Sequence, residues 1–215
     1  MVSKEIFPSR EDWLVARKSY IGGSDAACIL GENPWKTNVQ LWEEKTGRTI
    51  PEDLSDNELV IYGIRAEEHI RALFELDHPE YAVFYEENNM FLNDETPWAH
   101  YSADGWLMDE NHRMGLLEIK TSTISSGAQG KKWLGQIPQN YYIQILHGLM
   151  VTEYEFAVLR ARIKHPRTDG SFYIEEKDYR IDRNEDEIKF LREKEKEFAY
   201  YLKNEIRPAL LLPEI

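Results

Sequence analysis

The chain is poor in cysteine and contains no long apolar run. Cys28 is the single cysteine of its 215 residues, so no intrachain disulfide can form. We expect Cys28, within the apolar segment 26–30, to pack in the core rather than act as a nucleophile. No apolar stretch is long enough to span a bilayer, and residues 1–12 lack the continuous apolar segment of a signal peptide. These absences predict a cytoplasmic protein.

Positive charge is also scarce. The chain has 26 Lys and Arg against 39 Asp and Glu, which gives a net charge of −13. A protein that coats DNA by nonspecific electrostatics needs clustered basic residues, so the composition argues against that class. An enzyme that holds nucleic acid in one confined groove remains compatible with it. The sequence shows no phosphate-loop motif, zinc-type Cys/His spacing, internal repeat or low-complexity linker.

One predicted hairpin carries the candidate chemistry. Residues 116–120 (LLEIK) read as a buried strand, and side chains alternate along a strand, so Glu118 and Lys120 point the same way. Asp104 precedes another apolar run. If residues 109–112 form the turn, Asp104 and Glu118 meet at one end of the sheet. Carboxylates converging beside a lysine suit Mg²⁺ or Mn²⁺. The alternative is a surface hairpin with solvated side chains.

The N-terminal part contains a candidate anion site. We expect a helix capped by Ser9 that runs to Arg17, then a turn at residues 21–25 (IGGSD) that starts a second helix capped by Ser24 or Gly23. Exposed amide groups and the dipole at a helix N-terminus favour an anion, so a phosphate could bind between Arg17 and Ser24. The alternative is an ordinary helix cap.

A longer helix is predicted at about residues 57–76. Four apolar residues recur on it at helical spacing: Ile64, Ile70, Leu73 and Phe74. Glu67 falls on this stripe, whereas Glu68 lies nearer the polar side. An acid on an inward face needs a partner, which is a metal ion or an arginine such as Arg71 or Arg65.

The rest of the chain alternates between strand and helix patterns. Periodicity predicts helices at 38–46, 137–150 and 184–206 and strands at 81–85, 89–92, 155–163 and 171–181. A polar, Gly-containing loop occupies residues 122–136. Tyr141 and Gln144, three residues apart on a predicted helix, share a side that could face Glu118 and Lys120. The alternative is that Tyr141 packs and Gln144 is solvated.

In combination these patterns resemble the lambda-exonuclease-like family of phage recombination nucleases, also called YqaJ-type viral recombinases, within the PD-(D/E)xK nuclease superfamily. The resemblance covers about residues 13–162. Any one of its segments is common by chance, but five in matching order are not: Arg17 with Ile21–Asp25, Tyr62–Glu67, Ser102–Gly105, Leu117–Lys120 and Tyr141–Gln144.

The resemblance implies an α/β (α+β) fold with a restriction-endonuclease-like core, a central mixed β-sheet flanked by helices. Residues 1–215 would form a single nuclease domain. Its parts would be a helical region at about 1–76, a sheet-containing catalytic core at about 77–181 and a C-terminal helix at about 184–206.

The resemblance also implies a metal site. Asp104, Glu118 and the main-chain carbonyl of Ile119 would ligate Mg²⁺, or Mn²⁺, and Glu67 would help to hold a second ion. Lys120 would position or help to deprotonate the attacking water. A phosphodiester is a hindered anion, so hydroxide attack needs metal ions that lower the pKa of water and neutralise the developing charge.

Further positions match the family's DNA contacts. Gln144 and Tyr141 would orient the lysine, the water or the scissile phosphate. Arg17, Ser24 and Ser102 would receive a terminal 5′-phosphate. The implied activity is a Mg²⁺-dependent 5′→3′ exonuclease that degrades one strand of double-stranded DNA to mononucleotides for phage-type homologous recombination in a bacterial host.

The family often forms a trimeric ring around DNA and works with a single-strand annealing protein. With a charge of −13, such a ring needs basic side chains along its channel, for example Lys131, Lys132, Arg160 and Arg162. The chain departs from the family pattern in its longer Asp104-to-Glu118 hairpin and in its 123–136 loop.

Two alternatives to this function stay open. The first is another PD-(D/E)xK nuclease, either a Cas4/RecB-like exonuclease or an endonuclease. The single cysteine counts against its iron–sulfur form, which needs several. The second is a catalytically inactive DNA-end-binding module.

Overall fold

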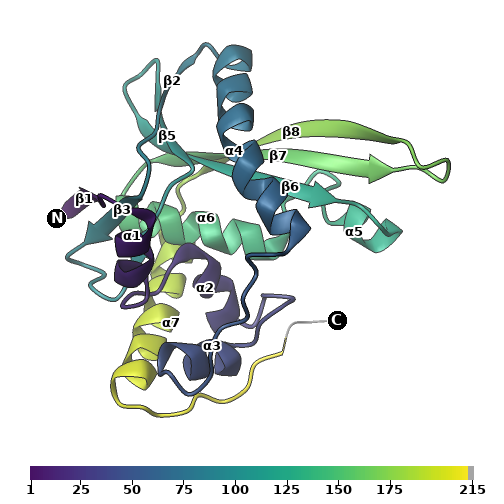
Figure 1. Cartoon of the computed structure of the whole chain (residues 1–215). Helices are drawn as coiled ribbons and strands as arrows, with labels where there is room; N and C mark the ends of the chain where they lie inside the picture. Colours follow the sequence, from purple (N-terminus) through teal and green to yellow (C-terminus); the bar gives the residue numbers. More distant parts are fainter. Residues whose placement is uncertain (213–215) are drawn as a thin grey trace.

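The computed structural model describes residues 1–212, which form two β-sheets and seven helices (Figure 1). The elements in chain order are β1 (Val2–Ile6), α1 (Arg10–Arg17), α2 (Gly23–Ile29), α3 (Asn38–Lys45), α4 (Glu58–Asp77), β2 (Tyr81–Phe84), β3 (Asn89–Asn93), β4 (His100–Tyr101), β5 (Gly105–Asp109), β6 (Met114–Thr123), α5 (Gly127–Lys131), α6 (Gln139–Thr152), β7 (Phe156–Pro166), β8 (Phe172–Asp182) and α7 (Glu185–Lys203).

The larger sheet has the strand order β2-β5-β6-β7-β8, in which β6 and β7 are parallel and the other neighbours antiparallel. Helix α4 crosses one face of this sheet and α6 lies against the other (Figure 1). The alternation along β6 explains both contacts. Leu117 packs with the α4 residue Phe74, whereas Leu116 packs with the α6 residue Leu149. The predicted mixed sheet flanked by helices is confirmed.

The smaller sheet has the order β1-β3-β4. Strand β1 was not predicted, because its residues are mostly exposed and show no apolar alternation; it forms by pairing with β3, with Val2 opposite Asn93. A bridge between Ile21 and Ala99 ties the segment before α2 to β4. Helix α2 packs against α6, and α3 and α7 pack against α2 (Figure 1).

Helix α6 is buried along most of its length, from Ile143 to Thr152 except Gln144. It approaches the sheet closely at Gly148, where an added Cβ would lie 2.7 Å from Leu116 and 2.8 Å from the ring of Tyr101. A larger residue there would push the helix away from the sheet. The glycine therefore sets the distance between α6 and the strands that carry the site.

The buried side of helix α4 is narrower than its apolar pattern predicted. Ile70 and Phe74 are buried, but Ile64 is 51% and Leu73 is 42% exposed, so these two assignments to the buried side were wrong. The inward line instead runs through Gly63, Glu67, Ile70 and Phe74, which follow one another at helical spacing. Glu67 therefore lies on the inward side, as predicted.

Other local predictions were confirmed. Ser9 caps α1 by accepting a hydrogen bond from the Asp12 N–H, and Cys28 is 2% exposed in the core. Burial raises the pKa of the Cys28 thiol to about 12, so it is not a reactive thiolate. The polar 122–136 loop contains α5, which was not predicted. None of the helices within residues 1–212 is both long and apolar enough to cross a membrane.

Candidate active site

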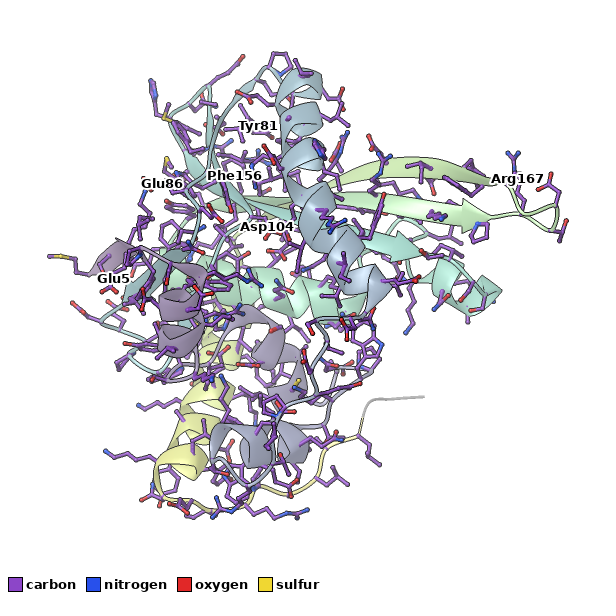
Figure 2. All side chains as sticks on the ribbon, in the orientation of Figure 1. Glu5, Tyr81, Glu86, Asp104, Phe156 and Arg167 are labelled. Carbon is purple, nitrogen blue, oxygen red and sulfur yellow. The ribbon has the colours of Figure 1, made fainter. Side chains whose placement is uncertain are left out.

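The site forms where β6 has an open edge. Strand β5 pairs with β6 only as far as Gly105, which lies opposite Leu117. From Glu118 onward β6 has β7 on one side and, among residues 1–212, no strand on the other. Asp104 immediately precedes β5 and so reaches this edge. Figure 2 labels Asp104 in the region between α4 and the strands.

Glu118 is 1% exposed and is held by three side chains. Its Oε1 lies 2.6 Å from Lys120 Nζ and accepts a hydrogen bond of 2.5 Å from Gln144 Nε2. Its Oε2 accepts a hydrogen bond from the hydroxyl of Tyr101. These contacts compensate the buried negative charge and fix the orientation of the carboxylate.

Asp104 is hydrogen-bonded to strand β6, which also carries Glu118. Its Oδ2 accepts a hydrogen bond of 2.9 Å from the main-chain N–H of Ile119. The N–H and C=O of one strand residue point to the same edge, so the Ile119 carbonyl also faces Asp104. Arg71 donates to the main-chain carbonyl of Asp104 and lies 3.5 Å from the centre of the Tyr85 ring. Arg71 therefore hydrogen-bonds to the main chain of Asp104 and does not form the ion pair with Glu67 that was the alternative to a metal ion.

The acids influence one another. Burial, followed by the charges of Glu118 and Glu67, raises the pKa of Asp104 well above its usual value. Burial also raises the pKa of Glu67, and the charge of Glu118 adds to that rise while Lys120 opposes it. The carboxylate of Glu67 makes no ion pair within residues 1–212. The raised pKa values mean that these neighbouring acids favour keeping a proton over carrying unpaired negative charge.

Lys120 points toward the acids and remains charged. Burial would lower its pKa, but the carboxylates of Glu118 and Asp104 outweigh that effect and raise it. The ammonium also lies 5.3 Å from the centre of the Tyr141 ring. In this arrangement Lys120 is a positioned cation rather than a neutral base.

The donor set suits a hard divalent cation. Glu67, Asp104 and Glu118 supply carboxylate oxygens, and the Ile119 carbonyl faces the same edge. Within residues 1–212, however, no three Asp, Glu, His or Cys side chains are close enough together to hold one ion. The reason at Glu118 is that both of its oxygens are engaged by Lys120, Gln144 and Tyr101.

The predicted phosphate-binding residues lie beside this site. The Arg17 guanidinium lies 4.2 Å from the centre of the Trp13 ring, and Trp13 Nε1 donates to Ser102 Oγ at 3.1 Å. Trp13 thereby connects Arg17 to Ser102, two residues before Asp104. Burial lowers the pKa of Arg17, partly offset by the charge of Asp25.

Helix α2 is capped differently from the prediction. Asp25 reaches back to the N–H of Gly22 at 3.0 Å and pairs with Lys45 at 2.8 Å, so neither Ser24 nor Gly23 is the cap. Asp25 is favoured as the capping side chain because its carboxylate also pairs with the half-buried Lys45. The exposed Ser24 hydroxyl has no capping role. The helix start packs against the site, since a Cβ on Gly23 would lie 3.0 Å from Gln144.

Two of the four proposed channel cations are already neutralised. The Arg160 side chain is 4% exposed and pairs with Asp77, Glu176 and Asp178, and Arg162 pairs with Glu176. Paired in this way, neither arginine offers an unpaired positive charge to a channel, and the channel itself stays a prediction. Strand alternation places them on the α4 side, where carboxylates converge. Lys131 and Lys132, on and after α5, stay exposed.

Tyr101 is a site residue that the sequence analysis missed. Its partner Glu118 lies in a different sheet, so no local spacing relates the two residues. The signal available was its position three residues before Asp104 in the segment YSAD.

Most of the chain matches a known protein family. The family model described as the YqaJ-like viral recombinase domain matches residues 12–155. The chain belongs to this family. It is 33% identical over 178 residues to the uncharacterized protein YqaJ of Bacillus subtilis (strain 168), covering 74% of this chain. The chain spans about half, 49%, of that relative's length.

Solved structures share the fold. An alkaline exonuclease from Laribacter hongkongensis matches with a TM-score of 0.68 and 20% identity, over 91% of this chain and 94% of that one. A phage-related exonuclease from Haemophilus somnus 129PT matches with a TM-score of 0.55 and 15% identity, over 87% and 96%. The mixed-sheet architecture found here is thus shared with these solved structures.

Proposed function

We propose that the protein is a Mg²⁺-dependent exonuclease that degrades one strand of double-stranded DNA from its 5′ end to mononucleotides in phage-type homologous recombination. The observation that carries this proposal is the meeting of Asp104, Glu118 and Lys120 at the open edge of β6. Family membership and the exonucleases among the fold neighbours support it.

The acidic residues and the lysine would have different roles in the reaction. Glu67, Asp104, Glu118 and the Ile119 carbonyl would hold one or two Mg²⁺ ions, with Mn²⁺ as a substitute. A bound ion would lower the pKa of the attacking water and neutralise the developing oxyanion. Lys120 adds a positive charge beside the attacking water.

Two other side chains keep Lys120 and Glu118 in place. Gln144 donates to the oxygen of Glu118 that also faces Lys120, and Tyr141 places its ring beside the ammonium. We assign to both an orienting role toward the lysine, the water or the scissile phosphate. An amide and a phenol ring are polar groups without a carboxylate, so each can orient its partner without adding another acid to the site.

The direction of digestion would follow from the phosphate-binding residues. Arg17, Ser24 and Ser102 would grip a terminal 5′-phosphate and limit how far the strand enters. Arg17 makes no ion pair within residues 1–212, which leaves its guanidinium free for a phosphate. A single nuclease domain, a trimeric ring on DNA ends and a single-strand annealing partner complete the proposal.

The deciding experiment is a nuclease assay on linear duplex DNA with Mg²⁺ or with EDTA. We expect acid-soluble mononucleotides with Mg²⁺, none with EDTA, and none from Asp104→Asn or Glu118→Gln. These substitutions keep size and hydrogen-bonding groups but remove the charge that would hold the ion. The matched control is Asp53→Asn, on an exposed loop, which should digest DNA like the parent.

Circular duplex DNA separates the alternatives. An end-dependent enzyme leaves it intact, whereas cleavage would identify an endonuclease. DNA-end binding without any turnover in Mg²⁺ or Mn²⁺ would identify an inactive end-binding module, and the exonuclease proposal would be wrong.

A further inference from the structure

Strands β7 and β8 extend beyond the end of β6 and form an arm with α5. Strand β6 ends at Thr123, opposite Lys164, while β7 and β8 continue to the pair Pro166 and Phe172. Figure 1 shows this hairpin projecting from the body, with α5 alongside its outer half, and Figure 2 labels Arg167 near its tip. We call residues 124–136 and 164–177 the arm.

A groove of about 380 Å³ runs between the two parts of the arm. From the hairpin it is lined by His165, Tyr173, Glu175 and Lys177, and from the α5 segment by Lys131 and Leu134, among others. The catalytic residues proposed above do not line it.

The groove carries a local excess of positive charge. Its single carboxylate in the lining, Glu175, already pairs with Lys177 at 3.1 Å and contacts His165 at 2.9 Å. Lys131 makes no ion pair within residues 1–212, and the same holds for Lys164 and Arg167 elsewhere in the arm. In a chain with a net charge of −13, this is a place where a polyanion meets little repulsion.

An aromatic ring stands among these cations. Tyr173 is 47% exposed and stacks on His165, with ring centres 4.4 Å apart and planes 2° apart. The guanidinium of Arg167 lies 5.4 Å from the Tyr173 ring centre. Exposed rings flanked by cations are the combination that binds single-stranded nucleic acid, because unpaired bases stack on the rings while phosphates meet the charges.

The groove lies on the sheet face that carries the site. Lys120 pairs in register with Ala161, and His165 follows four residues later on the same face of β7. At about 3.3 Å per strand residue the separation is about 13 Å. An unpaired strand is not confined to the double-helical rise of about 3.4 Å per nucleotide, so it spans this separation with at most about four nucleotides. Trp133 lines the groove and packs against Tyr141, which contacts Lys120.

We propose that this groove binds an unpaired DNA strand within about four nucleotides of the site at Glu118 and Lys120. That this strand is the one being cleaved rests on the proposed nuclease function. Binding of DNA by the groove does not rest on that function, because it depends on the arm cations and the Tyr173 ring, which take no part in the metal site.

The test measures binding of fluorescein-labelled oligothymidylates in EDTA, where no cleavage occurs. The variant is Lys131→Ala with Tyr173→Ala; both side chains are exposed, so the fold should persist. Losing one stacked base and one phosphate contact should weaken binding of a 12-mer about 10-fold or more. A trimer can occupy the groove without reaching the site, so its binding should also weaken in this variant.

The matched control is Lys194→Ala with Phe190→Ala. This exposed pair also places an ammonium near a ring, at 5.9 Å, but on α7. It should bind both oligonucleotides like the parent. Equal affinity of the groove variant and the parent for the 12-mer would reject the proposal. A changed oligomeric state in sedimentation without changed DNA affinity would also reject it and assign the groove to a subunit contact.

The two proposals fail separately. If Mg²⁺ produces no digestion but the groove variant still loses affinity for the 12-mer, the nuclease function is wrong and the groove stands. If digestion occurs and the groove variant binds the 12-mer like the parent, the groove is wrong and the nuclease function stands.

Discussion

At the scale of single residues, Asp104 is the position where function and stability oppose each other. Its pKa is raised by burial and by the neighbouring charges of Glu118 and Glu67. The folded protein therefore retains a proton that the unfolded chain releases at about pH 4, the usual range for aspartate. Stability must fall as the pH rises from about 4 through the raised pKa of Asp104, because the unfolded state then binds fewer protons than the folded state.

Replacing Asp104 with Asn should therefore stabilise the protein without divalent ions. An asparagine can still accept the Ile119 hydrogen bond but carries no charge. We expect the Tm of Asp104→Asn in EDTA to exceed that of the parent, by a margin that grows from pH 5 to pH 8. Thermal unfolding followed by circular dichroism measures this margin. A variant no more stable than the parent at pH 8 would contradict the assigned electrostatics.

Lys120 should act on the rate rather than on binding. Its ammonium touches Glu118 and lies next to the place where water would attack. Lys120→Ala should reduce kcat by about 10²-fold or more, the scale of removing one preorganised group that stabilises developing charge. Binding of DNA in EDTA should stay measurable. Single-turnover digestion gives the rate, and Lys189→Ala, an exposed lysine on α7, is the control. An unchanged kcat would refute the assigned role.

At the scale of elements, a buried pair joins α6 to α7. His147 Nδ1 lies 2.7 Å from Glu195 Oε1, and His147 Nε2 donates to the main-chain carbonyl of His100 at 2.8 Å. His147 and Glu195 are both fully buried. His100 immediately precedes Tyr101, which binds Glu118. The pair thus supports the backbone of β4 from behind the site.

Breaking this pair should cost much of the protein's stability. Glu195→Leu leaves His147 buried without its partner, and we expect the free energy of unfolding to fall by about 3 kcal/mol. Urea unfolding measures the loss. Glu193→Leu, on the exposed side of the same helix, should change stability by less than about 0.5 kcal/mol. Equal losses in the two variants would mean that the pair contributes nothing specific.

The pair should also make stability depend on pH. Burial lowers the pKa of His147, but the charge of Glu195 together with the hydrogen bonds to Glu195 and to the His100 carbonyl outweighs burial and raises the pKa above its usual value. A raised folded pKa stabilises the protein fully below the unfolded value of about 6.5, and this contribution is lost as the pH rises through the folded pKa. This dependence should be absent from Glu195→Leu.

At the scale of the whole molecule, the N-terminal helices bring a cation to the sheet. Arg17 belongs to α1, far in sequence from Asp104, yet it connects through Trp13 to Ser102. Arg17→Ala should slow digestion of duplexes with a 5′-phosphate by about 10-fold or more, because a charge-assisted phosphate contact is lost. Digestion of 5′-hydroxyl ends should change little. Arg10→Ala is the control. If Arg17→Ala slowed digestion of 5′-phosphate and 5′-hydroxyl ends equally, the assignment of a 5′-phosphate pocket would be wrong.

The distribution of charge over the molecule follows from the fold rather than from composition. Arg160 and Arg162 point to the face where Asp77 and Glu176 converge, so they are neutralised. Lys131 and Arg167 lie in the arm, where no carboxylate pairs with them among residues 1–212. A net charge of −13 therefore coexists with a locally basic surface.

The sequence by itself determined the local order of this protein. Period-two alternation placed Glu118 and Lys120 on one face, and the hairpin brought Asp104 opposite Glu118. Helical spacing placed Glu67 on the inward side of α4. These predictions succeeded because each depends on residues close together in the chain, where backbone periodicity alone fixes direction.

The tertiary structure alone decided what those residues touch. That Tyr101 and Gln144 hold Glu118, that Asp25 caps α2 and that three carboxylates neutralise Arg160 all depend on how helices and strands pack. Such contacts join residues distant in sequence, and the sequence contains many acidic residues that could pair with each basic side chain. Only packing in three dimensions, which brings particular side chains within hydrogen-bonding distance, selects among them.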